Sequence, residues 1–319
     1  MTAMKHRRFV ALLLVSAALS GACQFINRLQ GTAGPTSLYS PDPKAEPPIR
    51  LPTADGSLKF AAFGDFGTGT RWQYETAAQM VTTHETFPFE LALLLGDNLY
   101  SGSRPQDFVN DFERPYKALL DAGVKFYAAL GNHDDPNQRF YKNFNMGEQQ
   151  YYSFKAPTQN VRFFVLDTTY AAPEQLKWFE DELNASGEDW KIAYFHHPLY
   201  SSGGRHGSDA ALRDVLEPLL VKYNVSVVFT GHDHFYERIK PQKGIAHFVI
   251  GSGGKLAAGD IDRNSPLTAR GFDTDYAFLV GEIVGDNLYF NAITRTGGIM
   301  DSGIIGRRKD PASSVGSKH

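Results

Sequence analysis

The sequence predicts an α/β fold built on one mixed β-sheet or on two sheets packed face to face. Short apolar runs, typical of buried strands, alternate along the chain with amphipathic segments typical of helices. Near the C-terminus, Gly285-Asp286-Asn287 joins two further apolar runs and predicts an antiparallel hairpin. The alternation indicates parallel strands linked by helices, and the hairpin adds antiparallel ones.

The elements follow in chain order. The expected strands are Leu58–Phe63, Leu91–Leu95, Val124–Leu130, Arg162–Leu166, Ile192–Phe195, Val225–Phe229 and His247–Ile250, and the hairpin strands are Ala277–Val284 and Leu288–Thr294. The expected helices are Trp72–Thr83, Glu174–Leu183 and Ala210–Tyr223. Pro105, Pro136 and Pro173 stand where a first helical turn would begin, a position that proline favours.

Composition bounds the class of protein. The 319 residues are 42% hydrophobic and 13% aromatic, enough for a sizeable core, which excludes global disorder. The formal net charge is −3, and no basic tract interleaved with aromatic residues is present. We therefore expect no nucleic-acid partner.

The N-terminus has the pattern of a signal peptide over residues 1–22. A positive start with Lys5, Arg7 and Arg8 precedes the apolar run Phe9–Leu19, and Ser20-Gly21-Ala22 supplies small residues for cleavage. The apolar run is too short for a membrane-spanning helix. We expect an exported protein in the cell envelope (periplasm or outer surface) or secreted.

Cys23 is the only cysteine and follows the cleavage site directly, so no internal disulfide is possible. Leu19-Ser20-Gly21-Ala22-Cys23 resembles the lipobox of bacterial lipoproteins, although leucine lies four rather than three residues before the cysteine. Lipidated Cys23 would attach the protein to a membrane; the alternative is cleavage without a lipid.

The mature chain divides into three parts. Residues 23–56 carry many prolines and few large apolar residues, which predicts an extended tether. Residues 57–306 form the single folded domain, and residues 307–319 form a polar, flexible tail.

Five polar blocks follow the ends of predicted strands. They are Gly64-Asp65-Phe66-Gly67, Gly96-Asp97-Asn98-Leu99-Tyr100, Gly131-Asn132-His133-Asp134, His196-His197-Pro198 and Gly231-His232-Asp233-His234. Alone, Gly-Asp is typical of a turn and Asn-His-Asp of a helix start. Together they indicate one site, because ligands gather at the carboxyl ends of strands in α/β sheets.

The blocks supply carboxylates, an amide, a phenol and imidazoles. Such oxygen- and nitrogen-rich sets suit iron, manganese and zinc. Two such ions side by side form a clamp for in-line displacement at phosphorus, so the sequence predicts a two-metal phosphoesterase.

The ordered blocks resemble those of the calcineurin-like metallophosphoesterases, over about Lys59 to Arg295. Tyr100 in the second block narrows the resemblance to the purple acid phosphatases of the small single-domain type. The resemblance implies a four-layer αββα sandwich of two mixed β-sheets flanked by helices, with a dinuclear metal site at the rim formed by the strand C-termini.

The resemblance also implies the ligands. The first ion, ferric iron, would be held by Asp65, Asp97, Tyr100 and His234, and the second, ferrous iron, zinc or manganese, by Asp97, Asn132, His196 and His232. Asp97 would bridge the two ions. His196 is preferred to His197 because the family places its ligand two residues before the proline, which leaves His197 as a spacer.

The implied reaction is in-line attack on phosphorus by a hydroxide that the ions hold. His133 matches a histidine that contacts the phosphate, and His206 matches one that protonates the leaving alkoxide. Because His206 lies in a glycine-rich loop, an ordinary exposed histidine is the alternative.

We therefore expect an exported acid phosphatase that hydrolyses small phosphate monoesters. One alternative is a phosphodiesterase or nucleotidase with the same metal centre, because specificity would lie in rim loops such as Ser101–Gln106 and Ser201–Ser208. Another is a non-catalytic phosphate- or metal-binding envelope protein, which would predict lost ligands.

One further motif, Gly251-Ser252-Gly253-Gly254-Lys255, resembles a phosphate-binding loop. Its spacing is wrong, and Leu256 stands where that motif has Ser or Thr. We expect its glycines to let the backbone pass close to the metal rim.

Overall fold

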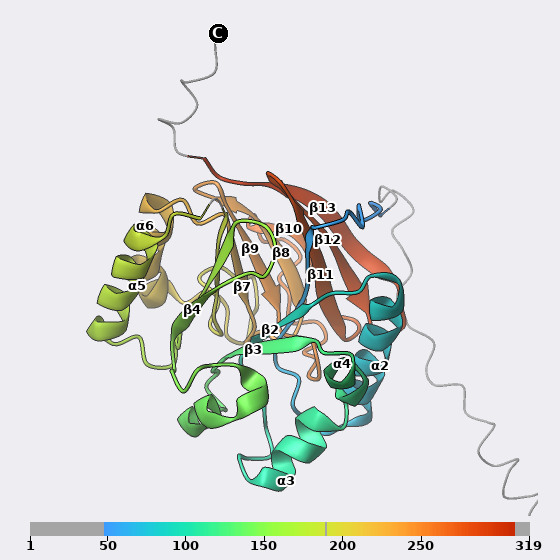
Figure 1. The fold of residues 1–319 in the computed structure, drawn as a ribbon. Helices are drawn as coiled ribbons and strands as arrows, with labels where there is room; N and C mark the ends of the chain where they lie inside the picture. Colours follow the sequence, from blue (N-terminus) through green and yellow to red (C-terminus); the bar gives the residue numbers. More distant parts are fainter. Residues whose placement is uncertain (1–47, 189, 310–319) are drawn as a thin grey trace, which may run out of the picture. The chain divides into compact units, whose positions relative to one another are not determined.

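Two mixed β-sheets flanked by helices make up the folded part of the chain (Figure 1). The computed structural model describes residues 48–188 and 190–309. The predicted signal peptide, Cys23 and most of the predicted tether lie outside the described residues, as do positions 310–319 of the predicted tail.

The first sheet has the strand order β13-β12-β11-β1-β2-β3. Its strands are β1 (Leu58–Phe63), β2 (Leu91–Leu95), β3 (Lys125–Ala129), β11 (Ala277–Val284), β12 (Asn287–Thr294) and β13 (Ile299–Gly306). β1, β2 and β3 are parallel, whereas β11 joins β1 in an antiparallel pair.

The second sheet has the order β10-β8-β9-β7-β6-β5-β4. Its strands are β4 (Tyr152–Lys155), β5 (Val161–Val165), β6 (Trp190–Tyr194), β7 (Val227–Thr230), β8 (Tyr236–Gln242), β9 (Ile245–Ile250) and β10 (Thr268–Phe272). β5, β6, β7 and β9 are parallel, so the second sheet has a parallel centre and antiparallel edges, whereas the first sheet has a parallel half and an antiparallel half.

Helices cover the outer faces of both sheets (Figure 1). They are α2 (Arg71–Thr86), α3 (Pro105–Phe108), α4 (Lys117–Asp121), α5 (Pro173–Ala185) and α6 (Ala210–Lys222), with short helical turns at Val109–Glu113, Pro136–Phe140 and Lys142–Phe144. In Figure 1, α5 and α6 lie together on one side, and α2 and α4 lie on the other.

The main core lies between the sheets. The Phe60 ring of β1 meets Phe163 of β5 and Phe229 of β7 edge to face, at centroid distances of 6.1 and 5.9 Å. Phe164, next to Phe163, points the other way and packs on Phe179 of α5. This alternation buries both faces of the second sheet and confirms the four-layer arrangement.

The predicted strands and helices all occur, with ends shifted by at most a few residues. Pro105 and Pro173 begin α3 and α5, and Pro136 begins a short turn, as predicted. The predicted hairpin is β11–β12. Missed by the sequence reasoning were β4, β8, β10 and β13, which carry polar or glycine residues and lack a buried apolar run.

The predicted tether and tail both contact the domain where they are described. Thr53 and Ala54 donate backbone hydrogen bonds of 2.8 and 2.7 Å to the buried carboxylate of Glu282 on β11. At the other end, the backbone N–H of Arg308 donates to Ser226 Oγ at 3.1 Å. Residues 53, 54 and 308 are therefore held against the domain.

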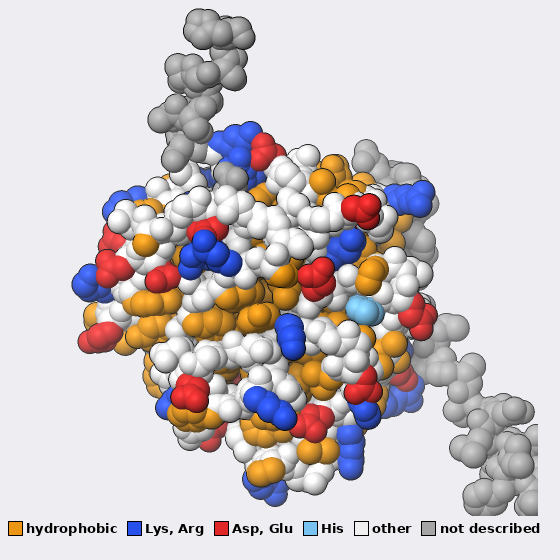
Figure 2. Space-filling view, viewed as in Figure 1, with side chains coloured by type: hydrophobic (Ala, Val, Ile, Leu, Met, Phe, Trp, Pro, Cys, Tyr) orange, Lys and Arg blue, Asp and Glu red, His pale blue; other side chains and the backbone are white. Residues whose placement is uncertain are grey.

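On the face drawn in Figure 2, Lys and Arg side chains are interspersed with Asp and Glu, and hydrophobic side chains show between them. Within the described residues, no helix is both long enough and apolar enough to cross a membrane.

Candidate metal centre

The polar blocks converge where the strand ends of the two sheets meet. The backbone N–H of Gly64, after β1, donates to the carbonyl of Ile250 at the end of β9, at 2.8 Å. His196, after β6, reaches the carbonyl of Leu95 at the end of β2, at 2.9 Å. One rim therefore carries residues from both sheets, as predicted.

The rim is tightly packed, and its backbone is unusual. A Cβ added at Gly131 would lie 2.2 Å from Asp97 Oδ1, so only glycine fits there. Asp65, Asp97 and His232 have left-handed φ values of 56°, 53° and 72°. Such conformations in non-glycine residues are costly and gather at functional sites.

One cluster contains Asp65, Tyr100 and His234. The hydroxyl of Tyr100 donates to Asp65 Oδ1 at 3.1 Å, and His234 Nε2 lies 3.4 Å from the same oxygen. Tyr100 Oη and His234 Nε2 are 3.5 Å apart. These three donor atoms face one small volume.

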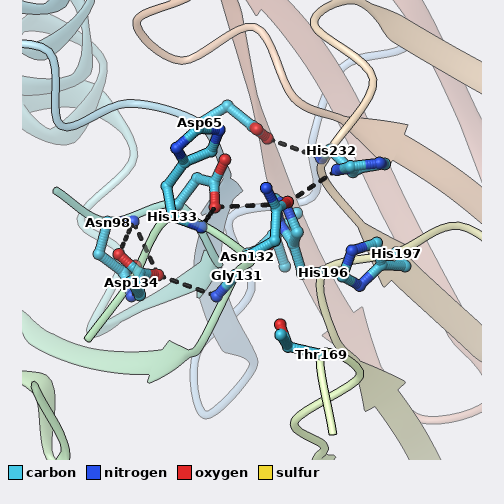
Figure 3. Close-up of polar contacts among 12 residues, drawn as sticks. Asp65, Asn98, Gly131, Asn132, His133, Asp134, Thr169, His196, His197 and His232 are labelled. Atoms are coloured by element: carbon cyan, nitrogen blue, oxygen red, sulfur yellow. Dashed lines mark hydrogen bonds and ion pairs between the residues drawn. The ribbon is translucent and has the colours of Figure 1, made fainter. Parts of the chain in front are cut away.

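A second cluster contains Asn132, His196 and His232 (Figure 3). His196 Nε2 lies 3.1 Å from Asn132 Oδ1 and 3.2 Å from His232 Nδ1. Because the carbonyl of Leu95 only accepts, Nδ1 of His196 donates to it, and Nε2 is the ring nitrogen that faces the cluster.

Asp97 lies between the clusters. Its Oδ2 accepts from Tyr100 at 2.8 Å, whereas its Oδ1 lies 3.4 Å from His196 Nε2 and accepts from the backbone N–H of His133 at 3.0 Å. Each carboxylate oxygen therefore faces a different cluster, which is the arrangement a bridging ligand requires.

The buried carboxylates of the site favour the binding of cations. Asp65 and Asp97 are buried, and among the described residues neither has a Lys or Arg within ion-pair distance. Burial, with the Asp65 and Asp97 carboxylates beside it, raises the pKa of Tyr100. Buried carboxylates are normally paired or bound to metal, and this donor set of oxygen and nitrogen atoms fits iron, zinc or manganese.

His232 favours the same interpretation. Burial, together with the neighbouring His196 and His197, lowers the pKa of His232 to about 2. His232 is therefore neutral, which is the form that binds metal. For Asp97, burial raises the pKa, but His196 and the N–H of His133 outweigh it, so the pKa is lowered.

Asp134 holds two loops of the rim together by hydrogen bonds, a role that sequence reasoning missed. Its carboxylate accepts backbone hydrogen bonds from Asn98 (2.8 Å), Leu99 (3.1 Å) and Gly131 (2.9 Å), and side-chain bonds from Asn98 and Gln138. Burial and the nearby Asp97 outweigh the backbone donors and raise the pKa of Asp134 to about 7. It thus ties the loop of Asp97 to the loop of Asn132 (Figure 3).

The two predicted catalytic histidines lie next to different residues of the clusters. The exposed ring of His133 is 4.9 Å from that of Tyr100, and the exposed ring of His206 is 4.3 Å from that of His232. His206 also lines a cleft of about 410 Å³ together with Arg205, His197 and His232. Its exposure is compatible with either of the two roles weighed from the sequence.

His197 is closer to the centre than its expected spacer role suggests. Its ring lies 4.5 Å from that of His232, and its donor atoms lie close enough to His196 and His232 to share an ion. Thr168 fixes it, accepting from the His197 backbone N–H at 3.1 Å and contacting Nδ1 at 2.9 Å. Nothing in the local sequence signals Thr168, because it follows a different strand.

The fold and the two clusters define a metal-dependent phosphoesterase. The family model described as calcineurin-like phosphoesterase matches residues 58–236. The chain belongs to this family.

Its relatives are purple acid phosphatases. Tartrate-resistant acid phosphatase type 5 of Mus musculus is 26% identical over 238 residues, covering 62% of this chain and 72% of the relative. Purple acid phosphatase 17 of Arabidopsis thaliana is 27% identical over 244 residues, covering 66% of this chain and 72% of the relative. The chain is thus a purple-acid-phosphatase-like metallophosphoesterase, as the blocks and Tyr100 predict.

A solved structure agrees on the fold. Purple acid phosphatase PPD1 from yellow lupin (Lupinus luteus) superposes with a TM-score of 0.66 at 22% identity, covering 81% of this chain and 55% of that one. At this identity, the likeness extends to the fold alone.

Asp134→Asn should loosen the whole rim. The new amide nitrogen would face N–H donors and leave at least one unsatisfied, so we expect a loss of about 3 kcal/mol in unfolding free energy and weaker metal binding. Urea unfolding and metal analysis would measure both. Asp135→Asn, at the exposed neighbouring position, is the control, and equal stability of the two variants would contradict the role of Asp134.

Proposed function

We propose that this chain is an exported acid phosphatase that hydrolyses phosphate monoesters at a dinuclear metal centre. The observation that carries the proposal is the position of Asp97, with one carboxylate oxygen toward each donor cluster. The relatives named as acid phosphatases support the reaction class.

The two clusters would hold the two ions. The first ion would bind Asp65, Asp97, Tyr100 and His234, and the second would bind Asp97, Asn132, His196 and His232. We propose ferric iron for the first, because burial and the neighbouring carboxylates raise the pKa of Tyr100, so that a strongly charged ion is needed to make it a phenolate. Ferrous iron, zinc or manganese would suit the second.

When bound, the ions lower the pKa of a water and neutralise charge on the phosphate oxygens. The protein orients the reactants. Asp97 fixes the spacing of the two clusters, and the exposed imidazole of His133 is free to contact a phosphate oxygen. His206, beside His232 at the cleft, would give a proton to the leaving oxygen.

Hydrolysis of p-nitrophenyl phosphate between pH 4 and 9 tests the function, with Asp97→Asn as the diagnostic variant. Asparagine tolerates the left-handed backbone at this position, so the fold should survive. Because one carboxylate would serve both ions, we expect loss of both and a fall in kcat/KM of at least about 100-fold.

Metal analysis of the same samples provides the second measurement. Full occupancy in Asp97→Asn would exclude the bridging role. Tight phosphate binding by the wild-type protein without turnover would exclude the phosphatase, and faster hydrolysis of bis-p-nitrophenyl phosphate would exclude a preference for monoesters.

His206→Ala should slow substrates unequally. A poor leaving group such as an alkyl alcohol needs the proton, whereas p-nitrophenolate does not, so kcat should fall about 100-fold for the first and little for the second. The measurement is kcat for a series of esters of graded leaving-group pKa. An equal loss across the series would exclude proton donation by His206.

We also propose export with a lipid on Cys23. This rests on the positive start, apolar run and small residues of positions 1–22, which lie outside the described residues. Mass spectrometry of the mature N-terminus should find acylated Cys23, and Cys23→Ser should release the protein from membranes. An unmodified Cys23 at the mature N-terminus would exclude the anchor.

A further inference from the structure

The glycine-rich block at 251–254 packs on the loop that carries Asp65. Gly253 donates to the carbonyl of Gly64, and Gly254 to that of Asp65, both at 3.1 Å. A Cβ added at Gly254 would lie 2.1 Å from the carbonyl oxygen of Phe66, so the two backbones touch. The expectation that this block passes close to the metal rim is confirmed.

The residue after the block, Lys255, is fixed from both sides. Before it, Gly254 is bonded to Asp65; after it, Ala257 donates to the carbonyl of His234 at 2.9 Å. Its ammonium nitrogen lies 3.6 Å from the centre of the Tyr100 ring. The segment around Lys255 therefore contacts all three residues of the first donor cluster.

The ammonium of Lys255 lacks an acidic partner. Lys255 is half-buried, and among the described residues no carboxylate lies within ion-pair distance of its Nζ. The face of an aromatic ring attracts a cation but does not satisfy its hydrogen-bond donors. A half-buried ammonium with free donors beside a phosphoesterase centre is suited to an anionic ligand.

Lys255 and His133 both lie beside Tyr100. The Lys255 ammonium lies over the face of the Tyr100 ring, and the ring of His133 lies 4.9 Å from the same ring. The ammonium and the histidine expected to contact the phosphate therefore share one neighbour in the first donor cluster. Lysine binds phosphate as a point charge with rotatable donors, so a unique geometry is not required.

We propose that Lys255 binds the phosphoryl group of the substrate, and the phosphate product, from the side of the first donor cluster. This inference rests on the proposed function, because it assigns a residue of the same site. On this proposal Lys255 is a substrate-binding residue, and the glycine-rich block at 251–254 positions Lys255.

Binding of inorganic phosphate to the metal-loaded full chain, measured by calorimetry, tests the inference. Lys255→Met should weaken phosphate binding about tenfold, as expected for one charge-assisted hydrogen bond that solvent partly screens. Lys255→Arg keeps the charge and should stay within about threefold of wild type. Lys177→Met, an exposed lysine of α5 paired with Asp181, is the control and should change nothing.

Three results would overturn the inference. One is unchanged phosphate affinity in Lys255→Met. If only the visible absorption of a Tyr100–iron bond shifted in that variant, Lys255 would act on Tyr100 alone, and the inference would also be wrong. Another is loss of the ions in Lys255→Met, which would make the residue structural. The third is a wild-type protein that binds no phosphate. Failure of the wild type to hydrolyse p-nitrophenyl phosphate would instead refute the proposed function, so the two failures are distinguishable.

Discussion

Contact between the strand ends of two separate sheets is the constraint on which this structure depends. The ends of β1, β2 and β6 approach so closely that side chains would block them: a Cβ at Gly96 would lie 2.6 Å from Nδ1 of His196. Glycine at these positions lets the backbone of one sheet touch side chains of the other. Without that contact, Asp97 and His196 could not meet, because they come from different sheets.

The same contact gathers negative charge that hydrogen bonds and His196 stabilise only from within the site and that cations would neutralise. Asp65 and Asp97 are both buried, and both accept a hydrogen bond from Tyr100. Both also have a left-handed backbone conformation. Such burial of negative charge and strain costs stability, which other parts of the fold must offset. Cations bound to the clusters would remove the repulsion and would thereby couple metal binding to folding stability.

Sequence reasoning located the rim because it depends on local signals. A buried apolar run followed by a polar block shows where a strand ends, and this was sufficient for β1, β2 and β7. It could not find partners that meet only in space. Asp134 looked like a helix cap, yet it accepts hydrogen bonds from a loop 36 residues away. Thr168 reaches the site from another loop, and edge strands such as β4 lack the apolar run that marks a buried strand.

The loops around the rim are held by acidic residues that are separate from the donor clusters. Buried Glu237 of β8 accepts from the backbone and hydroxyl of Ser202 at 2.9 and 2.6 Å and from the hydroxyl of Thr268. Asp273 likewise accepts from the backbone N–H groups of Gly259 and Ile261 at 3.0 and 3.4 Å. Because these anchors lie outside the clusters, a loop such as Ser201–Ser208 is held without the use of the donor atoms. The fold thus separates the residues that would hold metal from those that would choose a substrate, which explains why the donor set alone does not distinguish a monoester from a diester.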